Sequence, residues 1–130
     1  MSLMVHGTKT TLAYFATLAY YVNRMSENPQ AALELLVLKT LGRGPNHGFG
    51  IALHIEETSS ALLRVEEGSL YPALHRLEKT GFIEAEWKVT KNARRARVYR
   101  LTKDGRKRLK EIEKSWEQMS EGVRRVLGWA

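Results

Sequence analysis

The sequence contains no cysteine among its 130 residues. A disulfide framework and thiol chemistry are therefore excluded, and the composition fits a reducing compartment, so we expect a cytoplasmic location. The chain is not short of apolar residues, which make up 43% of it. That content is enough for a hydrophobic core, and the length fits a single domain with room for an appended helix.

The sequence also lacks an apolar stretch that would be expected to cross a bilayer, which needs about 20 residues. The apolar and aromatic run Leu12–Val22 is too short for that. A signal peptide is a weaker alternative, because no small-x-small cleavage site follows the run and Arg24 closes it. We expect residues 1–25 to form an accessory helix and expect no membrane partner, although Met25 is an alternative native start.

No catalytic or metal-binding motif is present. The four histidines do not occur in HExxH or in any other ligand spacing. The glycines between residues 42 and 50 lack the lysine of a phosphate-binding loop, and His47 among them is better explained as a helix-start residue. The adjacent carboxylates at 56–57 and 66–67 resemble a solvated surface rather than an acid/base pair. We therefore predict no enzyme activity, no cofactor and no metal.

Positive charge is abundant but unevenly distributed. The net charge is +7, yet residues 1–87 hold 7 Lys or Arg against 9 Glu, whereas residues 88–130 hold 14 against 5 acids. Between Lys88 and Lys110 there are 11 basic residues and one acid, Asp104. Such a local density favours an anionic partner, with nucleic acid preferred over a membrane surface. The alternative is a solvated basic face that only aids solubility.

Two helices are predicted in the first half of the chain. The pair Asn28–Pro29 has the form of an N-cap followed by proline at the first helical position, and an apolar helix follows as far as Leu41. Because this helix is apolar on two sides, we expect it at the centre of the domain. A second helix is predicted over residues 47–59, with Ile51 and Ile55 directed inward.

A third helix is predicted between Gly68 and Gly81. Leucines at 70, 74 and 77 form one apolar stripe. Ser69 is the predicted N-cap, Pro72 would fall in the first turn, and Gly81 would end the helix. The opposite face carries polar, basic and aromatic side chains, namely Tyr71, Pro72, His75, Arg76 and Lys79. Alone this pattern is also that of an ordinary amphipathic surface helix.

After Gly81 the apolar period changes from 3.6 residues to two, which predicts a β-hairpin. Apolar residues at 83, 85, 87 and 89 alternate with charged ones, and the chain returns over residues 96–101. The tip between them is all polar or basic at Lys91, Asn92, Arg94 and Arg95. Three helices followed by such a hairpin form a winged helix-turn-helix, in which the tip would touch a phosphate backbone.

The last segment, capped by Thr102, is predicted to be a helix reaching about Leu127. Its apolar residues are spaced alternately by three and four, which is the spacing of a coiled-coil seam. They are Leu109, Ile112, Trp116, Met119, Val123 and Val126. We predict a homodimer through this seam; packing on an N-terminal helix of the same chain is the alternative.

Three segments together resemble the PadR family of winged-helix transcriptional regulators. They read LKTLGRGPNHGFGIALHIEE, GSLYPALHRLEKTGFIEAEW and RRARVYRLTKDGRKRL, and the likeness covers about residues 30–127. The resemblance implies a homodimer built through the C-terminal helix, which represses nearby genes until a small molecule releases it. It also implies that the third helix enters the DNA major groove through Ser69, Tyr71, Pro72, His75 and Arg76. Lys91, Arg94 and Arg95 would then contact the DNA backbone.

In some members that bind flat aromatic compounds, a tryptophan of the last helix lines a cavity at the dimer centre. Trp116 occupies the matching place, although the seam pattern alone explains it as a core residue. The resulting prediction is a mainly α fold with a small β-hairpin. Residues 1–25 would be an extension, 26–101 the winged helix-turn-helix and 102–130 the dimerisation helix.

The predicted function is that of a regulator that binds double-stranded DNA. The main alternative is a winged-helix module that binds an acidic protein partner, and binding of double-stranded RNA is a third.

Overall fold

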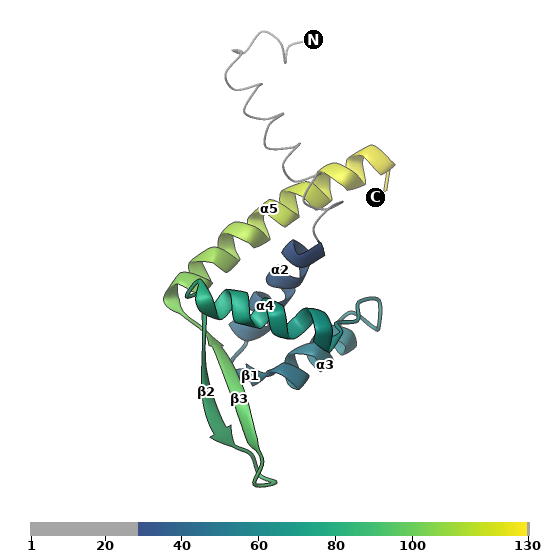
Figure 1. The fold of residues 1–130 in the computed structure, drawn as a ribbon. Helices are drawn as coiled ribbons and strands as arrows, with labels where there is room; N and C mark the ends of the chain where they lie inside the picture. The colour runs from purple at the N-terminus through teal and green to yellow at the C-terminus, as the bar shows by residue number, and fades with distance from the viewer. Residues whose placement is uncertain (1–28, 130) are drawn as a thin grey trace. The chain divides into compact units, whose positions relative to one another are not determined.

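The computed structural model describes residues 29–129, of which residues 33–129 belong to one compact unit. The predictions for residues 1–25 and for a cap at Asn28 lie outside the described residues. Four helices and a three-stranded sheet follow in the order α2, β1, α3, α4, β2, β3, α5 (Figure 1). Their bounds are α2 Pro29–Gly42, β1 Asn46–His47, α3 Gly48–Thr58, α4 Glu67–Lys79, β2 Ile83–Val89, β3 Arg95–Leu101 and α5 Lys103–Leu127. The predicted fold class, mainly α with a small β-hairpin, is confirmed.

The core gathers side chains from each of the four helices and from the hairpin. Val37 and Leu38 of α2 are completely buried, as are Ile51 of α3 and Leu74 of α4. Leu38 lies on the second apolar side predicted for α2, and its burial explains why this helix is apolar on two sides. Burial of a leucine or isoleucine side chain stabilises a fold by about 1.5–3 kcal/mol. These side chains therefore fix α3 and α4 against α2.

The strand β1 was not predicted from the sequence. Its two residues pair antiparallel with β3, Asn46 opposite Tyr99 and His47 opposite Val98, which gives the strand order β1-β3-β2. His47 is also the N-cap of α3, since its Nδ1 accepts a hydrogen bond from the Gly50 N–H at 3.0 Å. The interpretation of His47 as a helix-start residue is confirmed.

The predicted start of α4 is wrong, whereas its predicted end is confirmed. The helix begins at Glu67, because the Glu66 carbonyl already accepts hydrogen bonds from the Ser69 and Leu70 N–H groups. Ser69 is thus inside the first turn, and Pro72 lies in the second turn. At the other end Gly81 has a φ of 84°, and the Phe82 N–H donates to the Leu77 carbonyl at 3.0 Å. This pattern is a Schellman motif.

Thr102 joins the end of α4 to the start of α5. Its hydroxyl donates to the Gly81 carbonyl at 2.6 Å and accepts from the Gly105 N–H at 3.0 Å. Its N–H donates to the Phe82 carbonyl at 3.1 Å. A Cβ at Gly105 would overlap that same carbonyl, so the first turn of α5 can lie there only with glycine. The predicted cap at Thr102 is confirmed.

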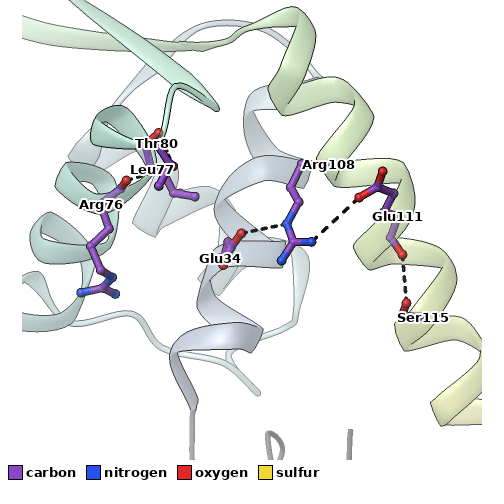
Figure 2. Close-up of polar contacts among 7 residues, drawn as sticks. All are labelled: Glu34, Arg76, Leu77, Thr80, Arg108, Glu111 and Ser115. Atoms are coloured by element: carbon purple, nitrogen blue, oxygen red, sulfur yellow. Dashed lines mark hydrogen bonds and ion pairs between the residues drawn. The ribbon is translucent and has the colours of Figure 1, made fainter. Parts of the chain in front are cut away.

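Two ion pairs connect α5 to α2. Lys39 lies 2.7 Å from Glu113, and Arg108 Nε lies 3.5 Å from Glu34. Figure 2 shows the Arg108 side chain reaching from α5 towards Glu34, with Glu111 on its other side. Exposed or half-exposed pairs of this kind contribute about 0–1 kcal/mol each. They serve mainly to set the direction of α5 along α2.

Candidate nucleic-acid interface

The outward face of α4 carries the side chains that the sequence assigned to DNA contact. Its inward face is fixed by four buried residues, Leu70, Ala73, Leu74 and Leu77. The six predicted contact residues on this helix all lie exposed, and they are Ser69, Tyr71, Pro72, His75, Arg76 and Lys79. A helix held rigidly on one side thus presents hydrogen-bond donors on the other.

Arg76 is an exposed donor on the outward face of α4. Its carbonyl accepts a hydrogen bond from the Thr80 hydroxyl at 3.0 Å, which holds the last turn of α4 (Figure 2). Its guanidinium points in a different direction from the buried Leu77, and it forms no ion pair within residues 29–129. A guanidinium without a carboxylate partner keeps its donors available for a base edge or a phosphate.

The hairpin tip, residues 90–94, is held only by its own turn. The Thr90 N–H donates to the Arg94 carbonyl at 2.8 Å, and Ala93 has a φ of 57°. Each side chain of the tip is exposed. In Figure 1 the tip lies at the far end of the hairpin, away from α3 and α4. Lys91, Asn92 and Arg94 are therefore brought together on a projecting loop.

An ion pair couples α4 to the hairpin. Arg97 Nη2 of β3 lies 2.6 Å from Glu78 Oε2 of α4, and the Arg97 guanidinium also lies over the Tyr99 ring at 5.9 Å. Burial raises the pKa of the Tyr99 hydroxyl, and the positive charge of Arg97 partly opposes that rise. Arg97 thus connects α4 to the hairpin at the position opposite Trp87.

A groove that the sequence did not predict separates the hairpin from the helices. It has a volume of about 550 Å³ and lies between the first turn of α3, Tyr71 of α4 and the inner face of the hairpin. Ile83 is buried on this face of the hairpin, whereas Trp87 is 58% exposed and Val89 is 72% exposed. Trp87 is exposed because the groove lies between it and the side chains of α3 and α4.

The apolar seam of α5 is covered only near its start. Leu109 is buried and Ile112 packs against the core. Trp116 and Met119 are half-buried, whereas Val123 and Val126 are exposed, the latter at 88%. Packing within the unit thus accounts for the first two seam residues, and no other described residue covers the last two.

Within residues 29–129, no three His, Asp or Glu side chains come close enough to hold a metal ion. None of the helices in this part of the chain is both long and apolar enough to cross a membrane.

The fold and the exposed basic face define a winged helix-turn-helix. Similarity to known proteins shows the family to which it belongs. Residues 37–111 match the model of the transcriptional regulator PadR-like family. The transcriptional regulator Rv3488 of Mycobacterium tuberculosis is 38% identical over 104 residues, which cover 80% of this chain and 91% of that protein. The chain belongs to the PadR-like family of transcriptional regulators.

Solved structures agree with this assignment. A transcriptional regulator from Clostridium thermocellum aligns with a TM-score of 0.67 at 27% identity, covering 75% of this chain and 94% of that one. Bacillus subtilis PadR, solved in complex with operator DNA, aligns with a TM-score of 0.56 at 24% identity. That alignment covers 61% of this chain and 45% of the Bacillus protein, and it shows a shared fold.

Proposed function

We propose that this protein binds double-stranded operator DNA as a homodimer and represses transcription until a small molecule releases it. The observation that carries the proposal is the unpaired guanidinium of Arg76 on the outward face of a rigidly packed α4. Bacillus subtilis PadR, which shares the fold, was solved in complex with operator DNA, and this supports operator DNA as the partner. The local excess of positive charge after residue 88 fits a polyanionic partner.

In this proposal α4 is the recognition helix and lies in the major groove. Arg76 and His75 donate to base edges, Arg76 in particular to a guanine, while Tyr71 packs on a thymine methyl or bonds a phosphate. Ser69, Pro72 and Lys79 complete the contact surface. The hairpin tip contacts backbone or minor groove, where Lys91, Asn92, Arg94 and the adjacent Arg95 supply mainly counterion release.

The domain organisation follows from the same proposal. Residues 1–25 are an extension, residues 26–101 bind DNA, and residues 102–130 pair with a second copy of the chain. The exposed end of the α5 seam supports this pairing, because Val126 has no cover within residues 29–129. A two-fold dimer presents two recognition helices, so its operator is an inverted repeat with half-sites about 10 bp apart, or a multiple of that spacing.

The test compares two variants on cognate and scrambled duplexes at several salt concentrations. The cognate duplex is first selected from random or genomic DNA with the purified protein. Arg76→Ala should lose about 1–3 kcal/mol on the cognate duplex and little on the scrambled one. Arg94→Ala/Arg95→Ala should weaken both duplexes alike and reduce the salt slope by about one unit per lost phosphate contact.

The opposite pattern would contradict these roles. If the tip variant lost sequence preference while Arg76→Ala bound both duplexes as the wild type does, α4 would not be the recognition helix. If the wild-type protein selected no duplex at all, the proposal of operator binding would itself be wrong.

The dimer is tested by placing charges in the seam. Ile112→Asp/Met119→Asp should give a monomer or an unfolded chain, since a buried unpaired charge costs several kcal/mol. Sedimentation and circular dichroism separate these two outcomes. A double variant that still sediments as a folded dimer would show that the copies associate through another surface.

The effector is proposed to be flat and largely apolar, and to bind near Trp116 where the two copies meet. Offset stacking on an indole ring contributes about 1 kcal/mol beyond area burial. An aromatic dye should quench tryptophan fluorescence, and Trp116→Ala should abolish the quenching although Trp87 and Trp129 remain. Quenching that survives this substitution would place the binding site elsewhere.

A further inference from the structure

The groove between the hairpin and the helices combines exposed aromatic rings with arginines. Phe49 of α3 is 68% exposed, Tyr71 of α4 is 46% exposed and Trp87 of β2 is 58% exposed. All three line the groove together with Arg94, Arg95 and Arg97. Large aromatic side chains are the residues a fold normally buries, so three exposed rings around one groove need an explanation.

The proposed contact with duplex DNA gives a role to Tyr71 but does not explain Phe49 and Trp87. The arginines of the groove can bind phosphates of a duplex, because those phosphates lie on its outer surface. The faces of the bases are stacked inside the duplex and cannot lie on an indole or phenyl ring. A strand with unstacked bases offers both groups at once, a phosphate for the arginine and a base face for the ring.

The positions of the arginines fit such a strand. The Arg95 guanidinium lies over the Trp87 ring at 5.0 Å, and Arg97 lies 6.0 Å from the same ring. Arg97 is further held by Glu78 at 2.6 Å, whereas Arg95 has no carboxylate partner within residues 29–129. Arg95 can therefore move from the ring to a phosphate, and a base can take its place on the ring.

We propose that this groove binds single-stranded nucleic acid, with a base stacked on Trp87 and the adjacent phosphate held by Arg95. Phe49, which stacks against His47 with ring centroids 6.4 Å apart, offers a second aromatic platform across the groove. The net charge of the lining is positive, since Arg97 alone is paired with a carboxylate. Since Arg94 and Arg95 are also proposed to contact duplex DNA, the strand and the duplex should compete.

The experiment measures fluorescence anisotropy of short labelled homopolymers of thymidine and of uridine, titrated with the full-length protein. Trp87→Ala should weaken binding about tenfold, the loss expected when one base no longer stacks on an aromatic ring. Trp87→Phe, which keeps a ring, should restore most of the affinity. Tighter binding of the thymidine homopolymer would identify the natural ligand as single-stranded DNA. Tighter binding of the uridine homopolymer would identify it as RNA.

The matched control is Val89→Ala, on the same face of β2 but outside the groove lining. It should bind the homopolymers as the wild type does. Phe49→Ala, on the opposite wall, should weaken binding even if Trp87→Ala proves unstable by circular dichroism. An unlabelled duplex should displace the homopolymer from the wild-type protein.

The proposal is overturned if the wild type binds neither homopolymer, or if Trp87→Ala and Phe49→Ala both bind as the wild type does. An equal loss in Val89→Ala would also overturn it, because the effect would then not belong to the groove. These outcomes are independent of operator recognition, which Arg76→Ala tests on duplexes. Strand binding without duplex selection would leave this inference standing and remove the proposed function.

Discussion

The helix α4 and the hairpin tip both present basic side chains, but they are built in different ways. The inward face of α4 carries four buried apolar residues of the helix itself, and the helix ends in the Schellman motif at Gly81. The tip has no buried residue, and only the hydrogen bonds of its own turn hold it. A rigid helix can hold a donor at a fixed place against a base edge, whereas a loop suits the contact with phosphates, which tolerates small shifts.

The largest change in the free energy of unfolding is expected when a buried side chain of α4 is shortened. Leu74 is completely buried, so Leu74→Ala should lower the free energy of unfolding by about 2–5 kcal/mol. Val89→Ala, near the tip, should change it by less than about 0.5 kcal/mol, because Val89 is exposed. Urea denaturation followed by circular dichroism measures both. Equal losses in the two variants would mean that the tip is supported as strongly as α4.

A smaller effect is expected where α4 meets the hairpin. Gly81 has a φ of 84°, and an alanine in this left-handed region costs about 1–2 kcal/mol. Gly81→Ala should therefore destabilise the fold by that amount and loosen the link between helix and strand. The matched control is Gly122→Ala in α5, where a Cβ meets no atom within 4 Å. This control should instead gain about 0.5–1 kcal/mol of stability. A stable Gly81→Ala protein would contradict the account of the junction.

The smallest effect is expected from the ion pair between α4 and β3. The side chains of Arg97 and Glu78 are 41% and 29% exposed, so Glu78→Gln should cost only about 0.2–1 kcal/mol. The control Glu84→Gln breaks a more exposed pair with Arg100 and should cost less. A double-mutant cycle with Arg97→Gln isolates the pair energy. A coupling near zero would show that the hairpin keeps its place without this contact.

Most of the helices and the hairpin could be predicted because their signals are local. The stripe at Leu70, Leu74 and Leu77 and the glycine stop at 81 depend on neighbours within a few residues, and both were confirmed. The predicted start of α4 was wrong because it relied on the cap preference of a single residue. Ser69 is a good cap by type, but backbone hydrogen bonds to Glu66 extend the helix further than a cap preference could reveal.

The rest depends on distances between elements, which the sequence does not express. The strand β1 has two residues and exists only because β3 passes beside it. The exposure of Trp87 depends on the groove that lies between it and the side chains of α3 and α4. The lining of this groove comes from α3, α4 and the hairpin, which are far apart in the sequence, so no local pattern could indicate it.

The junction at Thr102 has a consequence for the evolution of the proposed operator. The hydroxyl and the N–H of Thr102 donate to the carbonyls of Gly81 and Phe82, and these bonds fix the angle between α4 and α5. In the proposed dimer this angle sets the distance between the two recognition helices. New base preferences can then arise by substitutions on the exposed face of α4, one residue at a time. A new half-site spacing requires a shift in the seam of α5. The base sequence and the half-site spacing of the operator can therefore change independently, through substitutions in different helices.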